Sequence, residues 1–260
     1  MTQIRWKYLT VPKLGNPSSE NEDAFFTYKL GPLTLLDSPF TCAMADGATT
    51  ATFSKLWASM VVKTFGRSVP AHDQFMGSLE KCQAEWKKHF QKMDLPWHTE
   101  EKIKMGSFAT LLWLAVFPHE PFQKAGGVFS SICLGDTCIF QLRKHKVIFC
   151  KPIEKSADFN NRPVLLPSLS TLNHSLKMDA HINLFSADWQ KGDHLLLATD
   201  ALAAFLIRKK EEDPDFISGF SDMVGTTWFD SKVFAIWVDH HRTERTLRND
   251  DTSLVSMTIL

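Results

Sequence analysis

The chain has 260 residues, with 29 Lys and Arg against 29 Asp and Glu, so its formal net charge is +0. A nucleic-acid-binding protein usually carries a basic excess or stripe that engages phosphates, and this balance argues against nucleic acid as a partner. Hydrophobic residues make up 44% and charged residues 22% of the sequence, which is typical of a folded protein with an ample core. We expect one layered domain over residues 1–260, because single domains of about 250 residues are common.

The N-terminus and the cysteines indicate the compartment. Residues 1–15 lack the apolar core of a signal peptide, and no stretch approaches the ~20 apolar residues that a membrane helix needs. We therefore expect a cytoplasmic protein without a membrane partner. The five cysteines are odd in number and contain no Cys-x-x-Cys pair, so reduced thiols are expected instead of a disulfide framework or a zinc site.

Two helices are expected early in the chain. Apolar residues recur at helical spacing from Phe53 to Phe65, with Thr50 as the candidate start and Gly66 as the candidate end. A second amphipathic helix is expected over residues 73–92, where Lys and Glu lie opposite the apolar face. Both helices should cover a flat apolar surface.

Strands are expected in a regular series along the rest of the chain. They are residues 24–26, 40–45, 108–117, 128–134, 139–142, 147–150, 194–198, 233–238 and 254–259. The continuous apolar run 108–117 is also compatible with a buried helix, because periodicity cannot decide for such a segment. Consecutive hairpin-like strands with two early helices favour the α+β class with antiparallel layers. Residues 151–181 lack sustained periodicity and predict a long connection, either a flap over a site or a plain surface loop.

Acidic residues recur at the ends of these strands. They are Glu22 with Asp23, Asp46, Asp136, Asp200, and Asp250 with Asp251. Each position alone is ordinary, because Asp is depleted inside strands and favoured in turns. Clustered carboxylates, however, are what hard Mg²⁺ or Mn²⁺ ions require, and two such ions can activate water and neutralise a phosphoryl group. If these acids converge, they could hold such ions.

The local contexts of these acids form an ordered set. Its members are Asn21-Glu22-Asp23-Ala24, Ala45-Asp46-Gly47-Ala48, Gly106-Ser107-Phe108-Ala109-Thr110, Leu134-Gly135-Asp136-Thr137, Gly192-Asp193 through Thr199-Asp200-Ala201-Leu202, and Asn249-Asp250-Asp251-Thr252-Ser253-Leu254-Val255. From about residue 15 to the end, they resemble the successive motifs of the type 2C metal-dependent protein serine/threonine phosphatases. The resemblance implies a bacterial-like stand-alone domain, folded as a four-layer α-β-β-α sandwich of two antiparallel sheets flanked by helices.

The resemblance also implies the metal ligands. Asp46 would bridge two Mg²⁺ or Mn²⁺ ions. Glu22 and the carbonyl of Gly47 would complete one site, and Asp200 and Asp250 the other. The implied reaction is attack of metal-activated water on the phosphorus of a phosphoserine or phosphothreonine in a protein substrate, without a phosphoenzyme. A cognate Ser/Thr kinase is the partner that this signalling activity implies.

Two further acids take supporting roles in the same comparison. Asp136 matches the family's further acidic position, which is associated with an additional metal ion. Asp23 would orient the catalytic water from behind the metal ligands.

Among the positions that depart from the family's pattern, two bear on how the substrate is held and protonated. Ser18 stands where members often carry an Arg that grips phosphate, and Ala48 stands where some place a His. Lys13 or Arg5 could replace the Arg, although each is also interpretable as a solvated surface charge. These departures motivate an alternative, in which the chain is a weak or inactive phosphatase-like module that binds a phosphorylated partner or scaffolds a kinase.

Overall fold

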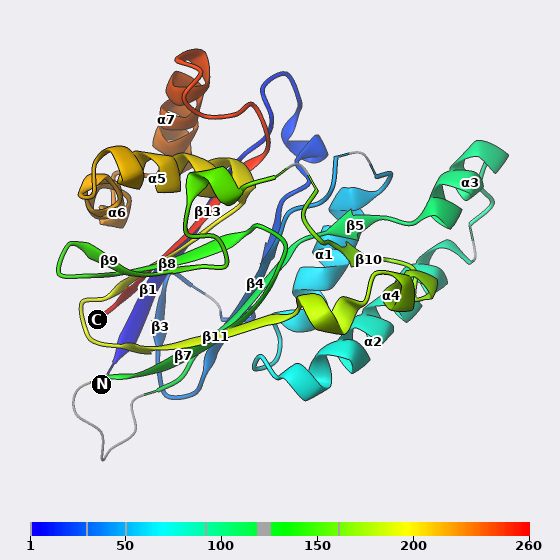
Figure 1. Cartoon of the computed structure of the whole chain (residues 1–260), viewed down its shortest axis with the longest axis horizontal. Helices are drawn as coiled ribbons and strands as arrows, with labels where there is room; N and C mark the ends of the chain where they lie inside the picture. Colours follow the sequence, from blue (N-terminus) through cyan, green and yellow to red (C-terminus); the bar gives the residue numbers. More distant parts are fainter. Residues whose placement is uncertain (1, 30, 50, 92, 119–125, 161) are drawn as a thin grey trace.

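The computed structural model describes residues 2–29, 31–49, 51–91, 93–118, 126–160 and 162–260. Within these residues two large antiparallel sheets pack face to face, and helices cover both outer faces (Figure 1). The expected α+β class and its four-layer α-β-β-α order are confirmed. No helix of the described part is both long and apolar enough to span a bilayer.

The first large sheet has six strands in the order β3-β1-β13-β12-β8-β9. Their bounds are β1 (Gln3–Val11), β3 (Leu33–Leu35), β8 (Cys138–Arg143), β9 (Lys146–Lys151), β12 (His194–Ala198) and β13 (Thr252–Ile259). Strand β1 pairs with β13 along eight residues, so the two ends of the chain lie side by side at the centre of this sheet.

The second large sheet has five strands in the order β11-β7-β6-β4-β2, and a separate pair joins β10 to β5. Their bounds are β2 (Ala24–Phe26), β4 (Phe40–Ala45), β5 (Phe108–Ala109), β6 (Leu111–Val116), β7 (Gly127–Leu134), β10 (Leu166–Pro167) and β11 (Asn183–Trp189). The ambiguous run 108–117 is therefore extended, as β5 and β6.

Side-chain alternation explains why the central strands read as continuous apolar runs. In β4, Phe40, Cys42 and Met44 point into the core between the sheets, whereas Ala43 and Ala45 face the helices. Both faces of the strand are buried, so apolar side chains point to both sides and Thr41 is the one polar residue of the strand. Small residues on the outer face leave room for helices to approach closely.

The helices divide between the two outer faces. Helices α1 (Ser54–Phe65) and α2 (His72–Phe90) cover the five-stranded sheet, and α5 (Asp200–Glu212), α6 (Phe216–Gly225) and α7 (Ser231–Thr243) cover the six-stranded sheet. Helix α3 (Trp97–Met105) buries none of its residues and projects beyond the sheets (Figure 1). The remaining short pieces are η1 (Ser18–Glu20), η2 (Ser156–Asp158), α4 (Thr171–Ser175) and η3 (Met178–His181).

The two expected helices are present as α1 and α2. The expected start at Thr50 lies outside the described residues, whereas the expected end at Gly66 is the C-cap of α1. In its described residues, the segment 151–181 holds only short elements between β9 and β11, and its role as a flap stays a prediction.

The strand predicted over residues 233–238 is wrong, because this segment lies inside α7. Phe234 and Val238 are buried four residues apart, whereas Ile236 is 71% exposed, which is helical and not strand periodicity. The carboxylate of Asp230 caps the helix by accepting from the N–H groups of Lys232 and Val233.

Candidate active site

An acidic pocket of about 240 Å³ opens where the ends of strands from both large sheets meet. Its wall includes Asp46, Gly47, Asp136, Asp200, Arg248 and Asp250. The four acids come from four separate points of the chain: the end of β4, the β7–β8 turn, the start of α5 after β12, and the approach to β13. The structure thus brings together five of the six predicted metal ligands.

Asp46 is fixed through its backbone. Its N–H donates to the hydroxyl of Thr110 at 2.8 Å, and the Thr110 N–H donates to the Asp46 carbonyl at 2.8 Å. The Thr110 hydroxyl also shares a 2.7 Å hydrogen bond with that of Thr137, beside Asp136. A Cβ at Gly47 would lie 2.9 Å from the backbone of Ser54, so only glycine lets β4 approach the start of α1 this closely.

The turn that presents Asp136 also depends on a glycine. Gly135 has φ of +95°, and a Cβ there would lie 2.7 Å from the side chain of Thr110. Both the dihedral and the contact exclude larger residues. The Gly-Asp pair of this motif therefore has a steric reason: the glycine makes the turn and the aspartate enters the pocket.

Glu22 is the predicted ligand that does not line the acidic pocket. Its carboxylate accepts a hydrogen bond from the Ser54 hydroxyl at the start of α1. Its backbone is nevertheless tied to the site, because its N–H donates to Asp251 at 2.6 Å and its carbonyl accepts from the Gly47 N–H at 3.3 Å. Glu22 is thus next to Gly47, with its side chain engaged by serine.

Asp23 is buried behind the pocket. One carboxylate oxygen, Oδ2, accepts from the Thr199 hydroxyl at 3.0 Å, and within the described part of the chain the other, Oδ1, has no hydrogen-bond partner. Asp23 also borders a neighbouring hollow that contains Ser18 and Lys55. A buried carboxylate oxygen without a partner is costly and calls for a water or an ion.

The electrostatics of the pocket favour a cation. Burial raises the pKa of Asp46 well above its usual value, and the nearby charges of Asp23, Asp200, Asp136 and Asp250 raise it further. Burial together with the charge of Asp200 raises the pKa of Asp136 to about 7. Carboxylates that hinder one another's ionisation in this way are stabilised by a bound positive charge.

The donor atoms fit a hard divalent ion, although they do not yet enclose one. All are carboxylate or carbonyl oxygens, the ligands that Mg²⁺ and Mn²⁺ prefer. In the described ranges, no three His, Cys, Asp or Glu side chains are arranged to hold a metal ion. Instead, Nη2 of Arg248 forms ion pairs with Asp200 and, at 3.1 Å, with Asp250.

Arg248 is the charged residue of the pocket wall that the sequence did not predict. Its only sequence signal is its place two positions before Asp250, next to the last acidic motif. The expected replacements for an N-terminal Arg lie elsewhere, because neither Lys13 nor Arg5 lines the acidic pocket. Lys13 Nζ is 4.0 Å from the Asp250 carboxylate.

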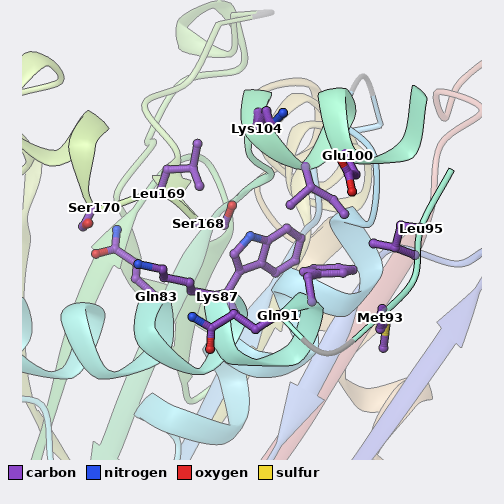
Figure 2. Close-up of a pocket in the computed structure, with 13 residues that line it drawn as sticks. Gln83, Lys87, Gln91, Met93, Leu95, Glu100, Lys104, Ser168, Leu169 and Ser170 are labelled. Carbon is purple, nitrogen blue, oxygen red and sulfur yellow. The ribbon is translucent and has the colours of Figure 1, made fainter. Parts of the chain in front are cut away.

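A third hollow has a different character. It is a groove of about 370 Å³ between α2, α3 and residues 168–170. Figure 2 shows Gln83 and Lys87 of α2 facing Glu100 and Lys104 of α3 across it. Its remaining wall is largely apolar, and Glu100 is the only carboxylate among its described lining residues. This groove lacks the acids that phosphoryl chemistry requires.

Solved structures share the fold over nearly their whole length. The catalytic domain of the serine/threonine phosphatase PstP in complex with two manganese ions matches at 13% identity and a TM-score of 0.58, with 100% of each chain covered. The Mycobacterium tuberculosis phosphatase PstP/Ppp matches at 13% identity and a TM-score of 0.57, with 98% of each chain covered. The Staphylococcus aureus phosphatase Stp1 matches at 11% identity and a TM-score of 0.61, covering 98% of this chain and 94% of that one.

Sequence comparison adds the family. No curated protein sequence matches this chain as a relative. A family model described as protein phosphatase 2C matches residues 18–232, a range that runs from the Ser18 position through the Asp200 motif. The matched range is most of the chain and contains five of the six motifs in full. The chain belongs to the protein phosphatase 2C family.

Proposed function

We propose that the acidic pocket is where this metal-dependent protein serine/threonine phosphatase hydrolyses phosphoserine and phosphothreonine side chains. The observation that carries the proposal is the convergence of Asp46, Asp136, Asp200 and Asp250 in one pocket of a protein phosphatase 2C chain. Neither the family match nor the shared fold favours the inactive module, the alternative that Ser18 and Ala48 suggested.

The family implies divalent metal ions, and the chain supplies the oxygens to hold them. We propose that the site would hold two Mg²⁺ or Mn²⁺ ions, with Asp46 as a ligand of both. Glu22 and the Gly47 carbonyl would hold one ion, and Asp200 and Asp250 would hold the other. The hydrogen bond between Gly47 and Glu22 supports the first group, and the shared contact of Asp200 and Asp250 with Arg248 supports the second.

An additional ion belongs to Asp136 in this proposal. Its carboxylate is buried, and its pKa of about 7 reflects burial and the neighbouring charge of Asp200. Because proton and metal compete for this carboxylate, the additional site should fill more completely as pH rises.

The reaction itself transfers a phosphoryl group to water. Bound divalent ions supply a lowered water pKa and neutralisation of the phosphoryl charge. Asp23 orients the attacking water through Oδ1, while Thr199 holds its other oxygen. Water oxygen bonds to phosphorus, the bond from phosphorus to the serine or threonine oxygen breaks, and that oxygen leaves with a proton. The products are the free hydroxyl side chain and inorganic phosphate.

The protein partners follow from this reaction. The substrates are phosphoproteins, and a serine/threonine kinase must supply them in a signalling pair. We place the reaction in the cytoplasm, because all five cysteines are buried, unpaired thiols. The absence of a nucleic-acid partner is proposed from the net charge of +0, and the absence of a membrane partner from the lack of a long apolar stretch in the sequence. One domain over residues 1–260 is supported by the pairing of β1 with β13.

The test is hydrolysis of p-nitrophenyl phosphate and of a phosphothreonine peptide with Mn²⁺. An Asp46→Asn, Asp200→Asn double variant should lose activity by about 10²-fold or more, because both proposed ion sites lose charge. Asp188→Asn, which removes an exposed carboxylate from β11, is the matched control and should keep full activity. Wild-type turnover no higher than that of the double variant would show the proposal to be wrong.

A further inference from the structure

Arg248 places a permanent positive charge in a pocket that is otherwise acidic. Of the described residues that line the acidic pocket, Arg248 alone is basic. A phosphomonoester carries negative charge, and four carboxylates repel it. Whatever metal ions contribute, Arg248 is the basic protein side chain positioned in this wall to attract the substrate.

The hydrogen bonds of Arg248 leave part of its guanidinium group free. Nη2 makes both ion pairs, with Asp200 and with Asp250. Within the described part of the chain, no partner is found for Nη1 or Nε. The side chain is 53% exposed, so these donors are accessible. A guanidinium has five N–H donors in a planar fork that matches two phosphate oxygens at once.

Three other cations lie near the pocket without lining it, and one of them, Lys13, has its Nζ 4.0 Å from the Asp250 carboxylate. Lys55, beside the Ser18 position, donates to the carbonyls of Ser18 at 3.2 Å and Ser19 at 2.8 Å, and it lines the neighbouring hollow. Arg242 of α7 is buried and donates to the Pro12 and Asp250 carbonyls. Arg242 therefore anchors the segment that carries Arg248 instead of binding substrate.

We propose that Arg248 is the side chain that binds the substrate's phosphoryl group, from the C-terminal side of the pocket. The proposal rests on the proposed function, because it assigns a residue of the same site. Its ligand class is the phosphomonoester dianion, with inorganic phosphate as the simplest member. Asp200 and Asp250 hold the guanidinium at the pocket wall. Divalent cations compete with it for the same oxygens, and a guanidinium released from them is available to phosphate.

The decisive variants are Arg248→Gln and Arg248→Lys. Arg248→Gln should raise KM for p-nitrophenyl phosphate and Ki for inorganic phosphate by about tenfold to a hundredfold, the range expected for lost charge-assisted hydrogen bonds. The value of kcat should change less. Arg248→Lys should fall between, since an ammonium keeps the charge and loses the planar fork. Arg245→Gln, an exposed arginine three residues earlier that does not line the pocket, should leave both constants unchanged.

Mn²⁺ binding distinguishes a substrate-binding role of Arg248 from a merely structural one. Calorimetric titration with Mn²⁺ should show Arg248→Gln binding the ion at least as tightly as the wild type, because a competing cation has been removed. Weaker Mn²⁺ binding with unchanged Ki for phosphate would overturn the proposal, since Arg248 would then only organise the carboxylates. The melting temperatures of both variants report whether they fold.

Failure of this proposal is distinguishable from failure of the proposed function. Calorimetric titration of the Mg²⁺-loaded protein with inorganic phosphate measures binding without turnover. Phosphate binding that depends on Arg248 in a protein without turnover would support the residue's role and refute the phosphatase. If the protein turns over substrate and Arg248→Gln leaves its affinity for phosphate unchanged, the phosphatase activity is supported and the phosphate-binding role of Arg248 is refuted.

Discussion

Asp136→Asn should stabilise the metal-free protein while weakening its metal binding. Asp136 is 5% exposed, and burial with the charge of Asp200 raises its pKa to about 7. An unfolded chain returns the carboxyl to its ordinary pKa, so the folded state binds the proton more tightly. The ionised Asp136 carboxylate therefore destabilises the folded protein. This loss of stability is absent below about pH 4, grows as pH rises toward 7, and reaches its full size above pH 7.

The size of the effect follows from the two pKa values. A rise from 3.8 to about 7 is roughly 3 units, and each unit corresponds to about 1.4 kcal/mol, which gives about 4 kcal/mol at pH 8. This is an upper limit, because neighbouring carboxylates share protons and relax when one of them is removed. Asparagine keeps the shape of the side chain and removes only its charge.

Urea denaturation in the presence of a chelator measures this difference. At pH 8 the Asp136→Asn variant should be more stable than the wild type by up to about 4 kcal/mol, and the gap should close by pH 4. Asp188→Asn, the exposed control, should stay within about 0.5 kcal/mol throughout. The electrostatic reasoning would be refuted if Asp136→Asn were less stable than the wild type at pH 8, or if the stability difference between the two proteins did not change with pH.

Three further substitutions test the packing around the site, each read from urea midpoints. Gly135→Ala should cost about 1–3 kcal/mol, because φ is +95° there and the new methyl group meets a neighbouring threonine at 2.7 Å; an unchanged midpoint would contradict this. Asp193→Ala should cost about 1–3 kcal/mol, because Arg143 and Gln141 lose the buried carboxylate that accepts their hydrogen bonds; a neutral effect would exclude that role. Phe234→Ala should cost about 3–5 kcal/mol while Ile236→Ala changes little, and equal effects would contradict the helical face of α7.

The strands of the fold could be read from the sequence where both faces are buried. The run Phe40–Ala45 sits between helices and the opposite sheet, so its apolar pattern is strong. Strand β1 was missed, because Arg5 and Lys7 interrupt its apolar pattern. The segment 233–238 was misread, since six consecutive residues without a charge resemble a strand and only packing shows that Ile236 faces solvent.

The candidate site was predictable to a similar degree. Asp46 and Asp136 stand beside glycines that the turns require, so short motifs record their geometry. The direction in which a carboxylate points depends on partners that are distant in sequence. The residues around Glu22 therefore do not predict that the Ser54 hydroxyl binds its carboxylate. Arg248 belongs to the same class, because only the folded chain brings it to Asp200.

Diffraction from a crystal soaked in Mn²⁺, recorded at the manganese absorption edge, tests the central claim most directly. Two anomalous peaks should appear in the acidic pocket, both in contact with the Asp46 carboxylate, and an Asp46→Asn crystal should lose them. A crystal that takes up Mn²⁺ elsewhere and leaves the pocket between Asp46, Asp200 and Asp250 without a peak would contradict the proposed metal-dependent active site.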